Sequence, residues 1–211
     1  MTSARTVLVV DDDPDVRESI RWLLESIGMT VVAYGDPTAF LDDVREGRTD
    51  GGCVLLDIRM PGMGGMEVQD WLRQQEVALP VIFLTGHGDV PVAVRALKNG
   101  AFDFIEKPYN AQHLIETVQR ALDAGEQERQ QRAMREAIRQ RLNDLTQREW
   151  EVSRLVAEGR TNKEIAQQLE VSPRTVEVHR ARAQDKLEAG STAGLVRMLM
   201  AWDPGGRGAD G

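Results

Sequence analysis

The sequence has few of the features that mark secreted or membrane proteins. Its 211 residues include a single cysteine, Cys53, so no disulfide can form within the chain. No run of about 18 apolar residues occurs, which argues against a transmembrane helix. The first residues lead directly into a predicted strand and lack the apolar stretch of a secretory signal. We therefore predict a cytoplasmic protein without membrane contact, in which Cys53 is a small residue in or near the core.

Basic residues are in the minority, and the excess of acid is confined to one part of the chain. Lys and Arg number 26 against 34 Asp and Glu, a net charge of −8. Residues 1–122 hold 11 basic and 19 acidic side chains, residues 123–143 hold 5 and 4, and residues 144–211 hold 10 and 11. Any contact with nucleic acid must therefore come from a local basic face rather than from the global charge.

Short aliphatic runs alternate with amphipathic patterns over the first 122 residues. The predicted strands are Thr6–Val10, Thr30–Tyr34, Cys53–Leu56, Val81–Thr85 and Phe102–Ile105. The predicted helices lie near residues 15–27, 37–46, 65–75, 90–99 and 111–123. Five strand–helix repeats favour an α/β fold, a doubly wound and mostly parallel sheet with helices on both faces.

Ionisable and hydroxyl side chains gather where these strands end. Asp57 closes the central strand, Asp11 and Asp12 follow the first, Thr85 closes the fourth and Lys107 follows the fifth. Parallel strands present their carboxyl ends at one edge of a sheet, where ligands bind. Converging carboxylates repel one another unless a hard cation such as Mg²⁺ bridges them. Since lysine and threonine suit phosphoryl oxygens, the set predicts phosphoryl transfer onto a carboxylate.

Four motifs in this order resemble the receiver domain of two-component response regulators. They are the Asp11-Asp12 pair, Leu-Asp-Ile-Arg-Met-Pro-Gly around Asp57, Thr85-Gly86-His87-Gly88-Asp89 and Glu106-Lys107-Pro108. The resemblance covers roughly residues 5–122 and implies a (βα)5 fold. It also implies a sensor histidine kinase as phosphoryl donor and Mg²⁺ as cofactor, with Mn²⁺ as a possible substitute.

The same resemblance implies a role for each residue of the site. Asp57 is the phosphoacceptor; Asp11, Asp12 and the main-chain carbonyl of Arg59 join it in holding the metal. Thr85 and Lys107 contact the phosphoryl group, and Phe104 turns inward together with Thr85 upon phosphorylation. The Lys107–Pro108 bond is expected to be cis, which proline makes accessible.

The first acidic cluster also fits patterns other than a phosphorylation site. Asp13 and Asp15 are expected to cap the first helix and to occupy its first turn. Asp11-x-Asp13 also resembles the nucleophile motif of haloacid-dehalogenase-like phosphatases, which usually have Thr or Val at the place of Asp15 and carry a separate cap domain. A calcium loop is rejected, because Val16 replaces the required glycine and Trp22 the bidentate glutamate.

A linker is predicted at residues 123–143, where helix formers dominate and large apolar residues are few. Met134, Ile138, Leu142 and Leu145 form one narrow apolar stripe. Such a helix packs along a domain, pairs with a second copy or serves as a mobile connector, and the stripe is too short to establish a coiled coil.

The segment 144–202 has the pattern of a helix-turn-helix domain. A capping box at Thr146 opens one helix with Val152, Leu155 and Val156 as its core face. A second helix spans 162–169, and a third runs from Pro173 to Leu187 with Val176, Ala183 and Leu187 buried. A last helix spans 191–202, and the glycine-rich residues 203–211 are expected to be disordered.

The string from Leu145-Thr-x-Arg-Glu to Val171-Ser-x-Arg-Thr-Val-Glu-Val-His179-Arg closely resembles the LuxR-type DNA-binding domain of the NarL/FixJ response regulators. The match covers about residues 142–201, and the receiver motif around Thr85 points to the FixJ branch. By this resemblance, the base-facing residues are Glu177, Val178 and Ala181. The candidate phosphate contacts are Thr161, Asn162, Lys163, Arg174, Thr175, Arg180 and Lys186.

The sequence as a whole therefore predicts a response regulator transcription factor rather than an enzyme with a separate substrate. Its receiver occupies residues 1–122, its linker 123–143 and its DNA-binding domain 144–202. Phosphorylation is expected to control homodimerisation and binding to promoter DNA, where RNA polymerase is the further partner. A phosphorylation-independent regulator that keeps the receiver as a dimer scaffold is the rival hypothesis, although a scaffold does not need the acid, threonine and lysine set.

Overall fold

The computed structural model describes residues 6–49, 51–86 and 90–201. The predicted motif residues His87, Gly88 and Asp89, the last-helix residue Trp202 and the predicted tail lie outside these ranges. The chain divides into two compact units, residues 1–130 and 131–211. Within the described ranges, no helix combines the length and the apolarity that crossing a membrane requires.

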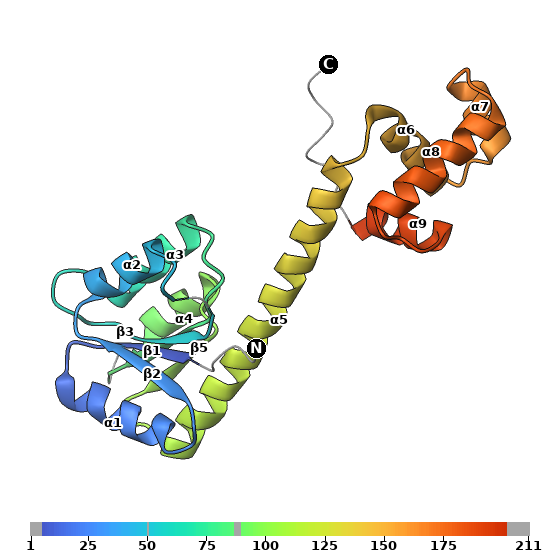
Figure 1. The fold of residues 1–211 in the computed structure, drawn as a ribbon. Coiled ribbons are helices and arrows are strands. Elements are labelled where there is room, and N and C mark those ends of the chain that lie inside the picture. The colour runs from blue at the N-terminus through green and yellow to red at the C-terminus, as the bar shows by residue number, and fades with distance from the viewer. Residues whose placement is uncertain (1–5, 50, 87–89, 202–211) are drawn as a thin grey trace. The chain divides into compact units, whose positions relative to one another are not determined.

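The first unit is built on a parallel sheet that, among the described residues, contains five strands (Figure 1). These are β1 (Thr6–Val10), β2 (Thr30–Tyr34), β3 (Cys53–Asp57), β4 (Val81–Thr85) and β5 (Asp103–Glu106). Their order is β2-β1-β3-β4-β5 with parallel pairing throughout. The predicted α/β fold is confirmed; β3 is one residue longer than expected and β5 is shifted by one residue, within the usual uncertainty of element ends.

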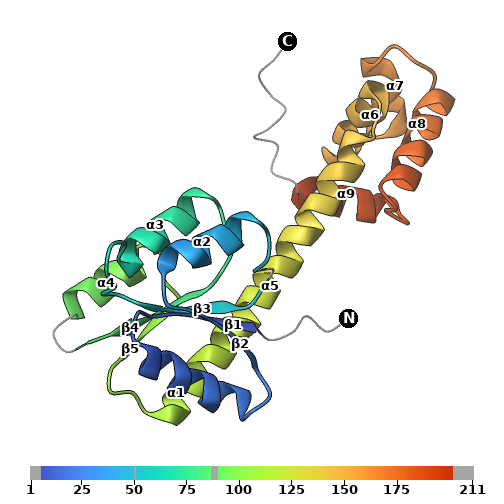
Figure 2. The same cartoon turned by 60° about the vertical axis from the view of Figure 1, so that its left-hand side comes forward.

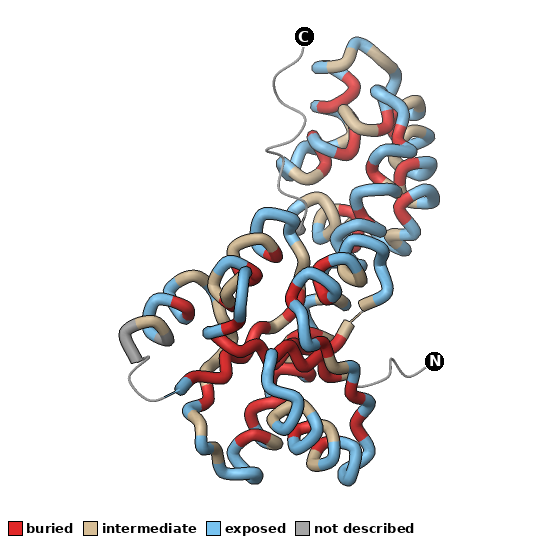
Figure 3. Tube along the Cα trace, turned by 90° about the vertical axis from the view of Figure 1, so that its left-hand side faces the viewer, coloured by how far each residue is buried: buried red, intermediate tan, exposed pale blue. Residues whose placement is uncertain are grey.

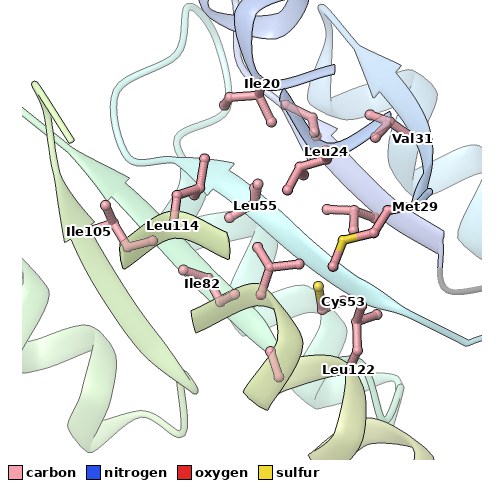
Figure 4. Close-up of a cluster of buried hydrophobic side chains, with 14 of the residues drawn as sticks. Ile20, Leu24, Met29, Val31, Cys53, Leu55, Ile82, Ile105, Leu114 and Leu122 are labelled. Atoms are coloured by element: carbon pink, nitrogen blue, oxygen red, sulfur yellow. The ribbon is translucent and has the colours of Figure 1, made fainter. Parts of the chain in front are cut away.

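Helices cover both faces of this sheet, as Figure 2 shows edge-on. They are α1 (Pro14–Glu25), α2 (Pro37–Arg45), α3 (Gly65–Gln74), α4 (Val90–Lys98) and α5 (Ala111–Asn143). The side chains of α1 and α5 pack on one face, and those of α2, α3 and α4 on the other. Figure 4 shows the first of these cores, where Cys53 lies fully buried among aliphatic side chains.

The second unit is helical, and its helices lie close to the ranges predicted for them, although the unit itself begins at residue 131, inside the predicted linker. It contains α6 (Gln147–Ala157), α7 (Asn162–Gln168), α8 (Pro173–Lys186) and α9 (Thr192–Ala201). Thr146, Thr161 and Ser172 cap α6, α7 and α8 through side-chain oxygens. The expected core residues are buried: Val152, Leu155, Val156, Val176, Ala183 and Leu187.

The predicted linker is part of α5, which runs without interruption from the first unit into the second. Met134 is 67% exposed, whereas Ile138, Leu142 and Leu145 are buried in the core of the second unit. Figure 3 shows how buried and exposed residues are distributed along the chain. Of the alternatives for the apolar stripe, packing along a domain is the one that the structure shows. Ile138, Leu142 and Leu145 are therefore not available as a seam for a second copy.

Candidate functional site

The edge formed by the carboxyl ends of the strands carries the predicted site. Asp57 is the last residue of β3, and Asp11 follows β1, which pairs directly with β3. Thr85 ends β4 and pairs in register with Glu106 of β5, immediately before Lys107. Adjacent parallel strands therefore bring residues that are up to 96 positions apart to one place.

Lys107 joins the two buried carboxylates of this edge. Its Nζ lies 2.7 Å from Oδ2 of Asp11 and 2.6 Å from Oδ1 of Asp57. Asp11 is 1% exposed and Asp57 7% exposed. Ionised groups this deeply buried require partners of opposite charge, and here one ammonium serves both acids.

The electrostatics of the trio follow from burial and from this sharing. Burial raises the pKa of Asp57; the hydrogen bond and charge of Lys107 act against it, while the charge of Asp11 adds to it. Burial alone would lower the pKa of Lys107, but its bonds to Asp11 and Asp57 outweigh that effect and raise it. Lys107 is therefore cationic at neutral pH. Two carboxylates beside one ammonium keep a net negative charge, which favours binding of a further cation.

Two further predicted residues, Arg59 and Thr85, are bonded to this trio through the main chain. The Arg59 amide donates to Oδ2 of Asp57 at 2.8 Å, and the Lys107 amide donates to the carbonyl of Thr85 at 2.7 Å. Thr85 is buried and Phe104 is half-buried at the α4 side of the sheet. The Lys107–Pro108 bond is cis, as predicted.

Neighbouring acids of the loop after β1 make different contacts. Asp13 caps α1 by accepting from the amides of Asp15 and Val16, as the sequence predicted. Asp12 is exposed, and Asp11 points its carboxylate at Lys107.

Among the described residues, no three His, Cys, Asp or Glu side chains converge as a ready metal cluster. Mg²⁺ does not require one, because it binds through one or two carboxylates, waters and phosphate oxygens; the paired hard oxygens of Asp11 and Asp57 fit it.

The second unit presents four of the predicted DNA-binding residues on one face of α8. Arg174, Glu177, Val178 and Ala181 are all exposed, with the 3-1-3 spacing of a single helical face. Val176 and Ala183 face the core on the other side. This is the division that a helix needs to enter a major groove.

Other predicted DNA contacts carry bonds within the unit. Arg180 donates to the Asn162 side chain at 3.2 Å, which links α8 to the start of α7. The Thr161 hydroxyl donates to Glu164, the Thr175 hydroxyl lies 2.8 Å from that of Ser172, and Lys163 is exposed.

Lys186 forms bonds within the second unit that the sequence did not predict. Its Nζ lies 2.7 Å from Glu149 and 3.0 Å from the carbonyl of Asp144. It thereby ties the end of α8 to the start of α6. Glu149 is the acid of the capping box at Thr146. No sequence pattern marks it as buried or as the partner of Lys186.

Residues 7–119 match the family described as "Response regulator receiver domain", and residues 143–199 match "Bacterial regulatory proteins, luxR family". The chain belongs to the response regulators of the NarL/FixJ family. The response regulator is thus a transcriptional regulator with a LuxR-type helix-turn-helix, and its control of transcription depends on phosphorylation.

Relatives of the response regulator match it over nearly their whole length. It is 39% identical to the "Transcriptional regulatory protein FixJ" of Bradyrhizobium diazoefficiens over 95% of this chain and 97% of that one. Identity is 42% to the protein of the same name from Azorhizobium caulinodans, over 95% and 94%. The solved structure of the response regulator StyR, 39% identical, matches with a TM-score of 0.86 over 95% of this chain and 100% of that chain.

Proposed function

We propose that Asp57 accepts a phosphoryl group from a phosphohistidine of a sensor histidine kinase. The observation that carries this proposal is the trio in which Lys107 bridges Asp11 and Asp57 at 2.7 and 2.6 Å. An exposed capping acid would have no such partner. A buried carboxylate held beside a cation at the strand edge is placed to attack and to have its product stabilised.

The transfer needs little beyond positioning and charge. An oxygen of Asp57 forms a bond to phosphorus, the phosphorus–nitrogen bond of the donor breaks, and the donor imidazole leaves. Asp11, Asp12, Asp57 and the carbonyl of Arg59 would hold Mg²⁺, or Mn²⁺ in its place, which supplies positive charge to the phosphoryl oxygens when bound. Lys107 and the hydroxyl of Thr85 contact the same oxygens. The protein acts on itself in this step, with no separate substrate to turn over.

Phosphorylation then changes the surface built from α4, β5 and α5. Thr85 and Phe104 move toward the phosphorylated site, and the altered surface favours a homodimer. Two copies of α8 then bind two half-sites of promoter DNA, where the dimer acts with RNA polymerase. In each copy, Glu177, Val178 and Ala181 meet bases, while Thr161, Asn162, Lys163, Arg174, Thr175 and Arg180 position the unit on phosphates. Lys186, bonded to Glu149, reaches phosphate only by giving up that pair.

The first test compares Asp57→Asn with Asp70→Asn, which removes an acid paired with Arg73 on the surface of α3. Both are incubated with acetyl phosphate and Mg²⁺, and acyl phosphate is measured by gel retardation. We expect wild-type incorporation in the Asp70 variant and none in the Asp57 variant. The Asp57 variant should also lose the dependence of its promoter-DNA affinity on phosphorylation. Phosphorylation that persists in Asp57→Asn would disprove the proposal.

A further inference from the structure

Arg17 of α1 lies beside the acidic loop without belonging to the predicted site. Its Nη1 donates to the main-chain carbonyl of Asp11 at 2.7 Å. The same guanidinium lies over Gly35: a Cβ placed there would be 3.2 Å from each of Cζ, Nη1 and Nη2. Asp11 follows β1 and Gly35 follows β2, so one side chain connects α1 with the ends of two strands.

We propose that Arg17 is a positioning residue for the metal-binding acids, and that Gly35 supplies the space in which it lies. This inference rests on the function proposed above. The main chain of Asp11 is held by Arg17 at its carbonyl and by the Tyr34 carbonyl at its amide, 3.2 Å away. Its carboxylate accepts from the amide of Asp13 at 3.0 Å and from Lys107. Arg17 contributes a charged donor to the backbone of this loop, and charge-assisted bonds are the stronger kind.

Positioning and charge predict opposite effects on metal binding. A guanidinium beside the acidic loop repels a divalent cation bound there, so its removal through charge alone would tighten Mg²⁺ binding. If the bond to Asp11 fixes the loop, its removal lets the acids spread and weakens Mg²⁺ binding. The sign of the change therefore separates a positioning residue from a nearby charge.

The experiment titrates Mg²⁺ calorimetrically into the full chain as wild type, Arg17→Met and Arg17→Lys. We expect Arg17→Met to raise the Kd for Mg²⁺ about tenfold, the lower end for residues that orient metal ligands. Arg17→Lys, which keeps one charged donor, should recover part of this loss. Phosphorylation by acetyl phosphate should need more Mg²⁺ in Arg17→Met, yet reach the wild-type plateau once the metal saturates.

Gly35→Ala gives a second route to the same contact while keeping the charge. The added methyl group displaces the guanidinium by a few tenths of an ångström and should raise the Kd in the wild-type background. In the Arg17→Met background the same substitution should have no effect, because the two changes act on one contact. Thermal unfolding of each variant checks that the fold is kept.

The outcomes separate this inference from the proposed function. Mg²⁺ binding that is unchanged in Asp11→Asn and Asp57→Asn would overturn the proposed site. Binding that is lost in those two variants, but unchanged or tighter in Arg17→Met, would overturn the role of Arg17 alone. Equal effects of Gly35→Ala in both backgrounds would overturn the pairing of Gly35 with Arg17.

Discussion

Two buried acids that share one lysine impose opposite demands on stability and on chemistry. The ammonium of Lys107 offsets the burial of Asp11 and Asp57 in the absence of metal. In the proposed reaction, the same ammonium would contact phosphoryl oxygens, and Asp11 and Asp57 would help to hold a divalent cation that supplies the positive charge these acids need. Lys107 is an internal counterion of the two acids, and under the proposed function it would also be a ligand of the incoming phosphoryl group.

Substitution of Lys107 by Met should therefore have a stability cost that metal removes. With two carboxylates left unpaired, we expect a loss of about 3 kcal/mol in the free energy of unfolding of the first unit in EDTA. Mg²⁺ should restore most of it, because the cation binds the folded form. Thermal unfolding with and without Mg²⁺ measures both effects, and Lys98→Met on α4 is the surface control. A loss that Mg²⁺ leaves unchanged would argue against a metal at this pair of acids.

Glu149 predicts a pH dependence of the second unit. Burial, which leaves it 3% exposed, would raise its pKa, but bonds from Lys186 and Thr146 outweigh burial and hold the pKa below the ordinary 4.5. A depressed pKa in the folded state means that the stabilisation is present above about pH 4.5 and is lost as the pH falls through the folded value.

Hydrogen exchange of α6 and α8 amides as a function of pH tests this. Glu149→Gln should flatten the loss of protection in acid, whereas Glu151→Gln on the same helix, which removes a surface pair with Arg148, should not. Equal acid sensitivity of wild type and Glu149→Gln would show that another group governs the acid limb.

At the scale of elements, the sequence predicts those whose apolar pattern is unambiguous. The fully buried β3 and β4, and helices α6 to α8 with their capping residues, lie where expected. The sequence does not predict that α5 is one continuous helix, because a glycine such as Gly125 destabilises a helix interior and is common where helices end. In the structure, a Cβ at Gly125 would lie 3.0 Å from Pro80 and 3.2 Å from the Gly52 carbonyl, so this glycine serves close packing and not a turn.

Topology can be predicted from the sequence, but individual side-chain contacts cannot. The alternation of strands implied that Asp57 and Lys107 meet, since topology alone brings strand ends together. No pattern places Arg17 on the carbonyl of Asp11, or Lys186 on Glu149, because each contact depends on how a flexible side chain settles on its neighbours.

The end of α5 gives a prediction at this scale. Ile138 lies in the core of the second unit, whereas Met134, one turn earlier, is 67% exposed. We expect Ile138→Ala to lower the free energy of unfolding of the second unit by about 2–4 kcal/mol, and Met134→Ala to change it by less than about 0.5 kcal/mol. Hydrogen exchange of α6 and α8 amides measures both. A small effect of Ile138→Ala would mean that the last turns of α5 are not part of the DNA-binding domain.

At the scale of the whole molecule, charge is distributed unevenly between the parts. The acid excess lies in residues 1–122, and residues 144–211 are nearly neutral. One DNA-binding unit with 10 basic and 11 acidic residues in 144–211 gains limited affinity from phosphates. When two such units are joined in a dimer, binding of the second unit to DNA becomes intramolecular. The affinity of the dimer for DNA then rises although each unit makes the same contacts as before. A phosphorylation that controls dimerisation would therefore control DNA binding.

Sedimentation velocity tests this coupling. The wild-type chain should shift from monomer to dimer when acetyl phosphate and Mg²⁺ are added, and Asp57→Ala should remain a monomer under both conditions. A symmetric dimer can place its two α8 helices on half-sites one or more turns of DNA apart. If wild type remains a monomer when phosphorylated, phosphorylation must act by exposing α8 within one chain. If it is already a dimer at rest, and Asp57→Ala is too, the receiver serves as a scaffold and the coupling proposed here is wrong.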